Sequence, residues 1–200
     1  RAALEPIHVE EGVFKYPDGR EVALFGTNYL PMSWWQYENM KALDADFPAA
    51  IARDVADMKA AGVQVVRVHF FESECADAEG NLVRNVHLDL FDRLVAELDK
   101  QGIYLFLTPT CWWESPASRP EAYSRHVTKM GMMYQEPAVS GSERFITQLL
   151  DHENPYTDRR LKDEPCLGVM EIINEPWYWP WDAVSKADYE PDFISWQISD

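Results

Sequence analysis

The chain has 200 residues, a length that suits one domain with a substantial core. Its formal net charge is −16, from 18 basic and 34 acidic residues, which disfavours nucleic acid and anionic membrane surfaces as partners. Hydrophobic residues make up 46% and charged residues 26% of the chain, so disorder, collagen and coiled coil are poor interpretations. Aromatic residues are abundant at 13%, and they include 8 tryptophans.

The first predicted elements form a β-hairpin. Residues 7–16 and 21–25 are strand-like, and the Pro17-Asp18-Gly19-Arg20 segment between them is typical of a turn. The second strand continues into residues 26–29.

Helices and apolar strands alternate along most of the remaining chain. The spacing of apolar residues predicts helices over 48–61, 88–100 and 142–150, and apolar runs predict strands over 63–70, 103–107 and 167–173. A loop broken by prolines covers about 108–140, and loops of this length are usually functional. The order predicts a parallel sheet covered by helices, without a repeat or an interdomain linker. The segment after residue 176 has no assignment.

The three cysteines are Cys75, Cys111 and Cys166. Their odd number and wide spacing suggest neither a disulfide framework nor a zinc site. One disulfide with one free thiol is open, but we expect three buried free thiols, because free cysteine packs as a small hydrophobe. No apolar run reaches the ~20 residues that span a bilayer. The chain begins at Arg1 rather than Met, so we expect its natural N-terminus to lie upstream, which is compatible with a secreted or extracytoplasmic protein.

Polar and aromatic side chains gather where the predicted strands end. In parallel α/β folds, functional groups collect at the carboxyl ends of strands. Asn28, His69 and Thr108 end or follow the first three strands, and Asn174 and Glu175 follow the fourth. Most tryptophans lie just beyond these ends: Trp34, Trp35, Trp112, Trp113, Trp177, Trp179 and Trp181. Because flat aromatic faces suit sugar rings, this placement favours a carbohydrate-binding rim over plain core packing.

Charged residues of two strands point to a common interior. Side chains alternate along a strand, so Arg67 and His69 share one face, as do Glu171, Ile173 and Glu175 on the other strand. An inward arginine needs an anionic partner, so we expect a structural ion pair between Arg67 and Glu171. Glu175 ends its strand among aromatic residues, a setting that suits a general acid. Asn174 beside it could bind a substrate hydroxyl.

These motifs resemble the clan A retaining glycoside hydrolases with a TIM-barrel fold, most closely family 5. The similar segments are GTNY at 26–29, VVRVH at 65–69 and MEIINEP at 170–176, and the resemblance extends over about residues 12–180. It implies that Glu175 is the acid/base, that Asn174 binds the 2-hydroxyl of the substrate, and that Arg67 supports the nucleophile. We expect the sugar-binding rim to comprise Asn28, Trp34, Trp35, His69, Trp112, Trp113 and Trp177.

The chain departs from the family in length. A (β/α)8 barrel needs ~250 residues, and the sequence supplies four barrel strands. We therefore expect residues 1–200 to form a single glycoside-hydrolase-like barrel domain, incomplete at its C-terminus, with strands 1–4 after an N-terminal hairpin. The family nucleophile ends strand seven, so no residue here has that role.

The expected function is retaining hydrolysis of β-linked sugars of the β-mannan or β-glucan type, without a cofactor or metal. The segment 153–176 resembles the β-mannanase branch. Residues 109–113 replace a histidine that many family 5 members carry after strand three. The sequence leaves the oligomeric state and the choice between endo and exo action open.

Four alternatives remain open from the sequence. The same scaffold could serve a non-catalytic carbohydrate-binding protein. The position of His69, two residues after Arg67, resembles the pattern of the related family 2 β-glycosidases, so a family 2-like enzyme is another alternative. A metal-dependent barrel enzyme could use His69, Glu72 and Glu74, although their spacing matches no standard ligand motif. Two copies could also assemble as half-barrels.

Overall fold

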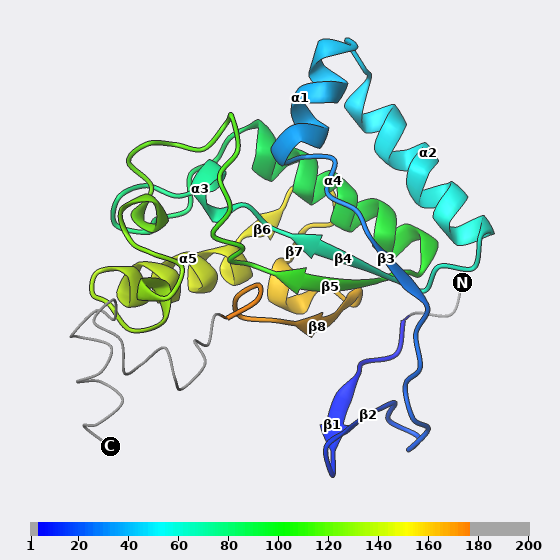
Figure 1. The fold of residues 1–200 in the computed structure, drawn as a ribbon. Coiled ribbons are helices and arrows are strands. Elements are labelled where there is room, and N and C mark those ends of the chain that lie inside the picture. The colour runs from blue at the N-terminus through cyan, green and yellow to red at the C-terminus, as the bar shows by residue number, and fades with distance from the viewer. Residues whose placement is uncertain (1–3, 177–200) are drawn as a thin grey trace, which may run out of the picture.

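A parallel four-stranded sheet forms the centre of the fold in the computed structural model, which describes residues 4–176 (Figure 1). Its order is β3-β4-β5-β8, the same as the order in the chain. The strands are β3 (Gly26–Asn28), β4 (Val65–His69), β5 (Tyr104–Thr108) and β8 (Leu167–Met170). Each crossover between neighbouring strands carries a helix, so the sheet consists of the first four strands of a (β/α) barrel, as predicted.

Helices fill the crossovers of this sheet. They are α1 (Trp34–Ala42), α2 (Phe47–Ala60), α3 (Glu72–Cys75), α4 (Val86–Gln101) and α5 (Ala138–Asp151), with 3₁₀ helices at Tyr123–His126, Gly131–Met133 and Leu161–Asp163. The α2 and α4 helices lie side by side over one face of the sheet (Figure 1). Asp46 caps α2 by accepting from the Ala49 N–H, and Asn85 caps α4.

The core lies between the sheet and these helices. Val66 and Val68 of β4 are fully buried on the face predicted to meet the helices. They join Leu105 and Leu107 of β5, together with apolar side chains of α2 and α4: Ile51, Val55, Leu94, Val95 and Leu98. The opposite face of β4 is therefore left to carry Arg67 and His69.

The predicted N-terminal hairpin is present, with a further turn inside the segment predicted as its first strand. The strands are β1 (His8–Glu10) and β2 (Val13–Lys15), so the single strand predicted over 7–16 is wrong. Gly12 takes a φ of 79° between them, a conformation open to glycine. The predicted turn at 17–20 does form, and it joins Lys15 to Glu21 by an isolated bridge.

Other elements differ from the sequence prediction at their ends or were not predicted. The α1 and α3 helices were not expected, because α1 buries no residue and α3 has four residues. A small hairpin, β6 (Glu153–Asn154) with β7 (Arg159–Arg160), was also missed. β8 ends at Met170, three residues before the predicted end.

All three cysteines are buried and free, as expected. Burial raises the pKa of each thiol, so Cys75, Cys111 and Cys166 stay protonated near neutral pH. Among the helices within residues 4–176, none combines the length and the apolar character that crossing a bilayer requires.

A close backbone contact fixes α5 against the loop that follows α3. Gly80 has a φ of 81°, and a Cβ added there would lie 2.6 Å from Gly141 Cα on α5. Gly62, which follows α2, has a similar φ of 84° and no atom within 4 Å of such a Cβ.

These two glycines form a matched pair for a stability test. We expect Gly62→Ala to lower the free energy of unfolding by roughly 1–2 kcal/mol, the cost of a left-handed backbone for an L residue. Gly80→Ala carries the same cost plus the steric clash, so its loss should be larger by about 1–3 kcal/mol. Urea unfolding of both variants measures the difference, and equal losses would contradict the contact.

Candidate active site

The carboxyl ends of the four strands lie in register along one edge of the sheet. Asn28 pairs with Arg67, His69 pairs with Thr108, and Leu107 pairs with Met170. Residues at or just after these positions therefore come together, as the barrel topology requires.

Arg67 is the centre of a polar cluster at this edge, formed with Thr108, Glu171 and Asn174. Its Nη2 forms an ion pair with Glu171 and donates to Asn174 Oδ1 at 3.2 Å. Thr108 Oγ1 donates to the same Glu171 oxygen at 2.7 Å. The guanidinium lies over the ring of Phe106, 5.4 Å from its centroid. The predicted ion pair between Arg67 and Glu171 is confirmed.

The charges of this cluster shift the pKa of its member Glu171 and of the neighbouring His69. Burial raises the pKa of Glu171, but the hydrogen bonds from Arg67 and Thr108 outweigh burial and leave the pKa below its usual range. Burial and the Arg67 charge lower the pKa of His69, against the opposing influence of Glu171, Asn174 and Glu175. His69 is therefore neutral near pH 7.

Asn174 and Glu175 diverge after the end of β8. Asn174 is 1% exposed and turns inward to Arg67, whereas the Glu175 side chain is 73% exposed. Glu175 has a φ of 48°, and Lys129 Nζ lies 3.5 Å from its Oε2. The prediction that Glu171 and Glu175 share a strand face is wrong, because the pleat of β8 stops at Met170. Lys129 was not predicted, since it belongs to the irregular loop after β5.

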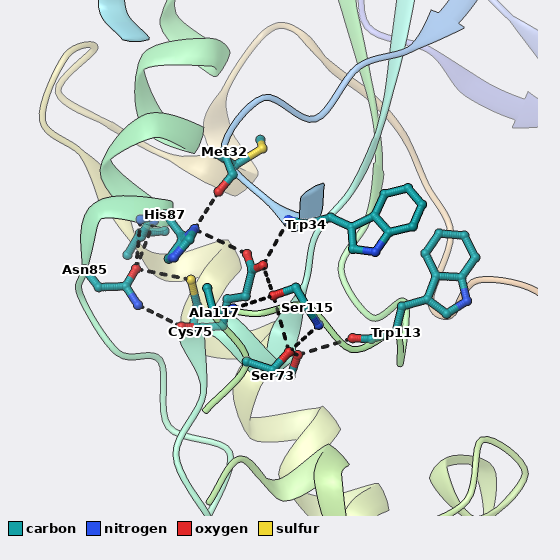
Figure 2. A network of polar contacts seen from close by, with 12 residues as sticks. Met32, Trp34, Ser73, Cys75, Asn85, His87, Trp113, Ser115 and Ala117 are labelled. Carbon is teal, nitrogen blue, oxygen red and sulfur yellow. Dashed lines mark hydrogen bonds and ion pairs between the residues drawn. The ribbon is translucent and has the colours of Figure 1, made fainter. Parts of the chain in front are cut away.

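An aromatic cluster lies next to the polar one. The Trp34 and Trp113 rings are 6.1 Å apart at 30°, and each lies 6.2 Å from the buried ring of Phe71. Figure 2 shows the two indoles side by side at the end of their loops. His69 lies 5.3 Å from the Trp113 ring, so the aromatic cluster borders the strand that carries Arg67.

The other predicted rim residues occupy varied settings. Trp35 is 56% exposed on α1, and Asn28 is exposed at the end of β3. Trp112 is half-buried, and its Nε1 donates to the carbonyl of Val127 at 3.1 Å. Trp177 lies outside the described residues, as do Trp179 and Trp181.

Several buried polar atoms at this edge keep unused hydrogen-bonding capacity. Within residues 4–176, Arg67 Nε, His69 Nε2 and Asn174 Nδ2 have no hydrogen-bond partner. Five further buried atoms in the described residues have no hydrogen-bond partner either, on Glu74, Thr110, Arg119, Tyr123 and Ser124. Unpaired buried polar atoms are destabilising, and a ligand or another segment can complete them. The first three atoms belong to residues that the sequence predicted for the site.

The acidic residues after β4 have a different use. Glu72 and Glu74 are buried, and they accept hydrogen bonds from backbone N–H groups of Cys111, Trp112 and Trp34. They do not bring ligand atoms together with His69. In the described part of the chain, such a grouping occurs at Asp99, Glu164 and Cys166, where Arg159 forms ion pairs with both carboxylates.

Comparison with known proteins relates this geometry to solved structures. No protein-family model and no curated protein sequence matches the chain. The endo-1,4-beta-mannanase from Rhizomucor miehei matches with a TM-score of 0.63 at 22% identity, over 86% of this chain and 48% of that one. The chain has the fold of half a glycoside hydrolase family 5 barrel.

Two further structures support the same half-barrel. A family 5 mannosidase from Rhizomucor miehei, in complex with mannosyl-fructose, matches with a TM-score of 0.63 at 13% identity, over 88% of this chain and 50% of that one. The beta-mannanase from the blue mussel Mytilus edulis matches with a TM-score of 0.52 at 19% identity, over 87% and 46%. The half-barrel thus spans about half the length of the structures it matches.

The ion pair of the polar cluster generates a pH prediction. We expect Glu171→Gln to lower the free energy of unfolding at pH 7 by about 1–3 kcal/mol, because it leaves the partly buried Arg67 charge without its carboxylate. The pKa of Glu171 is depressed in the folded state, so its contribution is present above the unfolded value of about 4.3 and is lost as the pH falls through the folded value.

Urea unfolding of both proteins between pH 7 and pH 3 tests this sign. The gap between wild type and variant should narrow toward the acidic end. A gap that stays constant over the whole range would show that the ion pair does not stabilise the fold.

Proposed function

We propose that the chain is the N-terminal half of a retaining glycoside hydrolase of the family 5 type, with Glu175 as the acid/base. The observation that carries the proposal is the divergence of Asn174 and Glu175. The amide is held inside by Arg67, and the adjacent carboxylate is exposed beside Lys129. In this arrangement one residue can fix a substrate hydroxyl while its neighbour exchanges a proton at the glycosidic oxygen.

The proposed reaction is a double displacement. Glu175 donates its proton to the glycosidic oxygen as the bond from that oxygen to the anomeric carbon breaks. A second carboxylate, outside the described residues, forms a bond to that carbon. Glu175 then takes a proton from water, whose oxygen displaces the carboxylate and completes the hydrolysis.

The polar cluster supplies the supporting groups for this reaction. Retaining enzymes place the nucleophile about 5–5.5 Å from the acid/base, and we propose that it lies on the Arg67 side of Glu175. The unpaired Arg67 Nε can donate to it. Asn174 Nδ2 is free to donate to the substrate's 2-hydroxyl, and neutral His69 offers Nε2 to the substrate or the nucleophile.

The rim supplies the sugar-binding surface. Trp34 and Trp113 present a partly exposed pair of indoles next to the polar cluster, and Trp35 extends this surface along α1. We also propose that Asn28, Trp112 and Trp177 contact the sugar, as the sequence predicts. Aromatic faces of this kind stack on the apolar faces of sugar rings.

We propose β-mannan as the substrate class. The matched structures are named as mannanases and mannosidases, and one of them holds mannosyl-fructose. The segment 153–176 favours the same branch on sequence. Because a polysaccharide is too large to cross a membrane, we propose a secreted enzyme that acts on substrate outside the cell. We also propose that residues 1–200 belong to one barrel domain, completed by chain that follows.

The acid/base assignment is tested in the full-length protein with Glu175→Ala. We expect kcat on aryl β-mannosides with poor leaving groups to fall about 10²–10⁴-fold, because such leaving groups depend on proton donation. Leaving groups that depart without protonation should be affected much less in the first step. Steady-state kinetics over a series of leaving groups measures this dependence.

Glu114→Ala is the matched control. Glu114 is another exposed glutamate beyond a strand end, and it forms an ion pair with Arg125 rather than joining the polar cluster. Its variant should keep wild-type turnover. Wild-type turnover by Glu175→Ala on poor leaving groups would refute the assignment. A wild-type protein that binds mannan without hydrolysing it would favour the non-catalytic alternative.

A further inference from the structure

The short helix α3 carries more buried polarity than a packing element needs. Its residues Glu72, Ser73, Glu74 and Cys75 are all at most 1% exposed. Removing two carboxylates from water costs several kcal/mol per ion unless their hydrogen bonds are made. The partners of these carboxylates therefore indicate what the helix does.

Glu74 holds the loop that follows β3. It accepts the backbone N–H of Trp34 at 3.0 Å and the Ser115 hydroxyl at 2.5 Å (Figure 2). His87 Nδ1 lies 3.3 Å from its other oxygen and 2.5 Å from the carbonyl of Met32. Glu74 thus joins the Trp34 loop, the Ser115 loop and α4 at one point.

Glu72 and Ser73 hold the loop that follows β5. Glu72 accepts the backbone N–H groups of Cys111 at 3.0 Å and Trp112 at 3.1 Å. Burial raises the pKa of Glu72, and these backbone donors oppose the rise. Ser73 Oγ donates to the carbonyl of Trp113 at 3.3 Å. The tryptophan-bearing loops after both strands are therefore anchored on one turn of helix.

Two of the three backbone N–H groups that these carboxylates accept belong to strained residues. Trp34 has a φ of 56° and Trp112 a φ of 63°, which are unusual for bulky side chains. Each such residue costs of order 1–3 kcal/mol and persists where its surroundings hold it. The N–H of Trp34 binds Glu74 and that of Trp112 binds Glu72, so each carboxylate stabilises one strained tryptophan.

We infer that Glu72, Ser73 and Glu74 act as positioning residues that set the spacing of the Trp34–Trp113 pair. This pair is the proposed sugar platform, so its spacing sets the affinity of the protein for its sugar substrate. Both indoles also lean on Phe71, the residue immediately before α3. The inference rests on the proposed function for the identity of the ligand. The geometric part of the inference is independent of the ligand: Glu72, Ser73 and Glu74, here called the clasp, hold two loops whose indoles lie 6.1 Å apart.

The test is made in the full-length protein and measures two quantities, the stacking of the Trp34–Trp113 pair without substrate and the KM for the substrate. Adjacent indoles produce an exciton couplet in circular dichroism, and Trp34→Phe identifies the part due to this pair. We expect Glu74→Leu to abolish that part. It should raise KM for mannooligosaccharides about 10-fold, the scale of a lost aromatic contact. We expect kcat to change less than about 2-fold, since a contact made equally in ground and transition states affects KM alone.

Conservative and matched variants separate positioning from stability. Glu74→Gln keeps one carbonyl oxygen for Trp34 and Ser115, so it should retain most of the couplet and of the KM. Asp92→Leu removes another buried carboxylate, which is paired with His152 at 2.8 Å rather than with the tryptophan-bearing loops. It should lower the midpoint of urea unfolding while leaving the couplet and KM unchanged. If Glu74→Leu does not fold, Ser73→Ala is measured in its place, with a smaller expected change in the same direction.

The outcomes discriminate clearly. A couplet unchanged in a folded Glu74→Leu protein would overturn the inference, as would a lost couplet with an unchanged KM. An equal loss of the couplet in Asp92→Leu would show that the effect comes from lower stability rather than from positioning, and it would overturn the inference too. Because the couplet needs no substrate, an inactive wild-type protein would refute the proposed function while the geometric test of the clasp still stood.

Discussion

The ion pair between Arg67 and Glu171 joins the second and fourth strands of the sheet across β5. An inward guanidinium in a half-buried setting requires an anion, and Glu171 supplies it with help from the Thr108 hydroxyl. Because Nη2 also binds Asn174, the same charge fixes where the chain goes after β8. The direction of the Glu175 side chain follows from this contact, because the adjacent Asn174 is held in the interior by Arg67.

A second use of buried charge lies behind the aromatic cluster. Glu72 and Glu74 accept hydrogen bonds from backbone N–H groups of two loops rather than from arginine or lysine side chains. Backbone donors fix a loop more directly than side-chain ion pairs, because they specify the path of the chain itself. The polar cluster and the aromatic cluster are thus both held by carboxylates, one through a charge and one through the backbone.

The half-barrel leaves apolar surface at both edges of its sheet. Phe25 before β3 is 63% exposed, and Ile172 after β8 is 59% exposed. In the proposed complete barrel, further strands would pair with these edges and bring the second carboxylate to the unpaired atoms of Arg67, His69 and Asn174. The acid/base and the sugar platform would then belong to one half of the enzyme and the nucleophile to the other.

The sequence by itself determined the parts that depend on short-range pattern. Short apolar runs predicted β4 and β5 closely, and helical spacing predicted α2 and α4. The inward face of β4 and the need to pair an arginine predicted the Arg67–Glu171 contact, and the Asn-Glu-Pro motif marked the candidate acid/base.

Tertiary structure decided the rest, because the deciding contacts join residues far apart in the chain. The bend after Met170 separates Asn174 from Glu175 only once Arg67 takes the amide, and Lys129 reaches Glu175 from a loop without periodicity. Glu74 meets Trp34 across 40 residues and Ser115 across 41, so its spacing alone gave no sign that it anchors backbone. A local pattern records which face a residue occupies, but the partner on that face exists only after the strands have assembled.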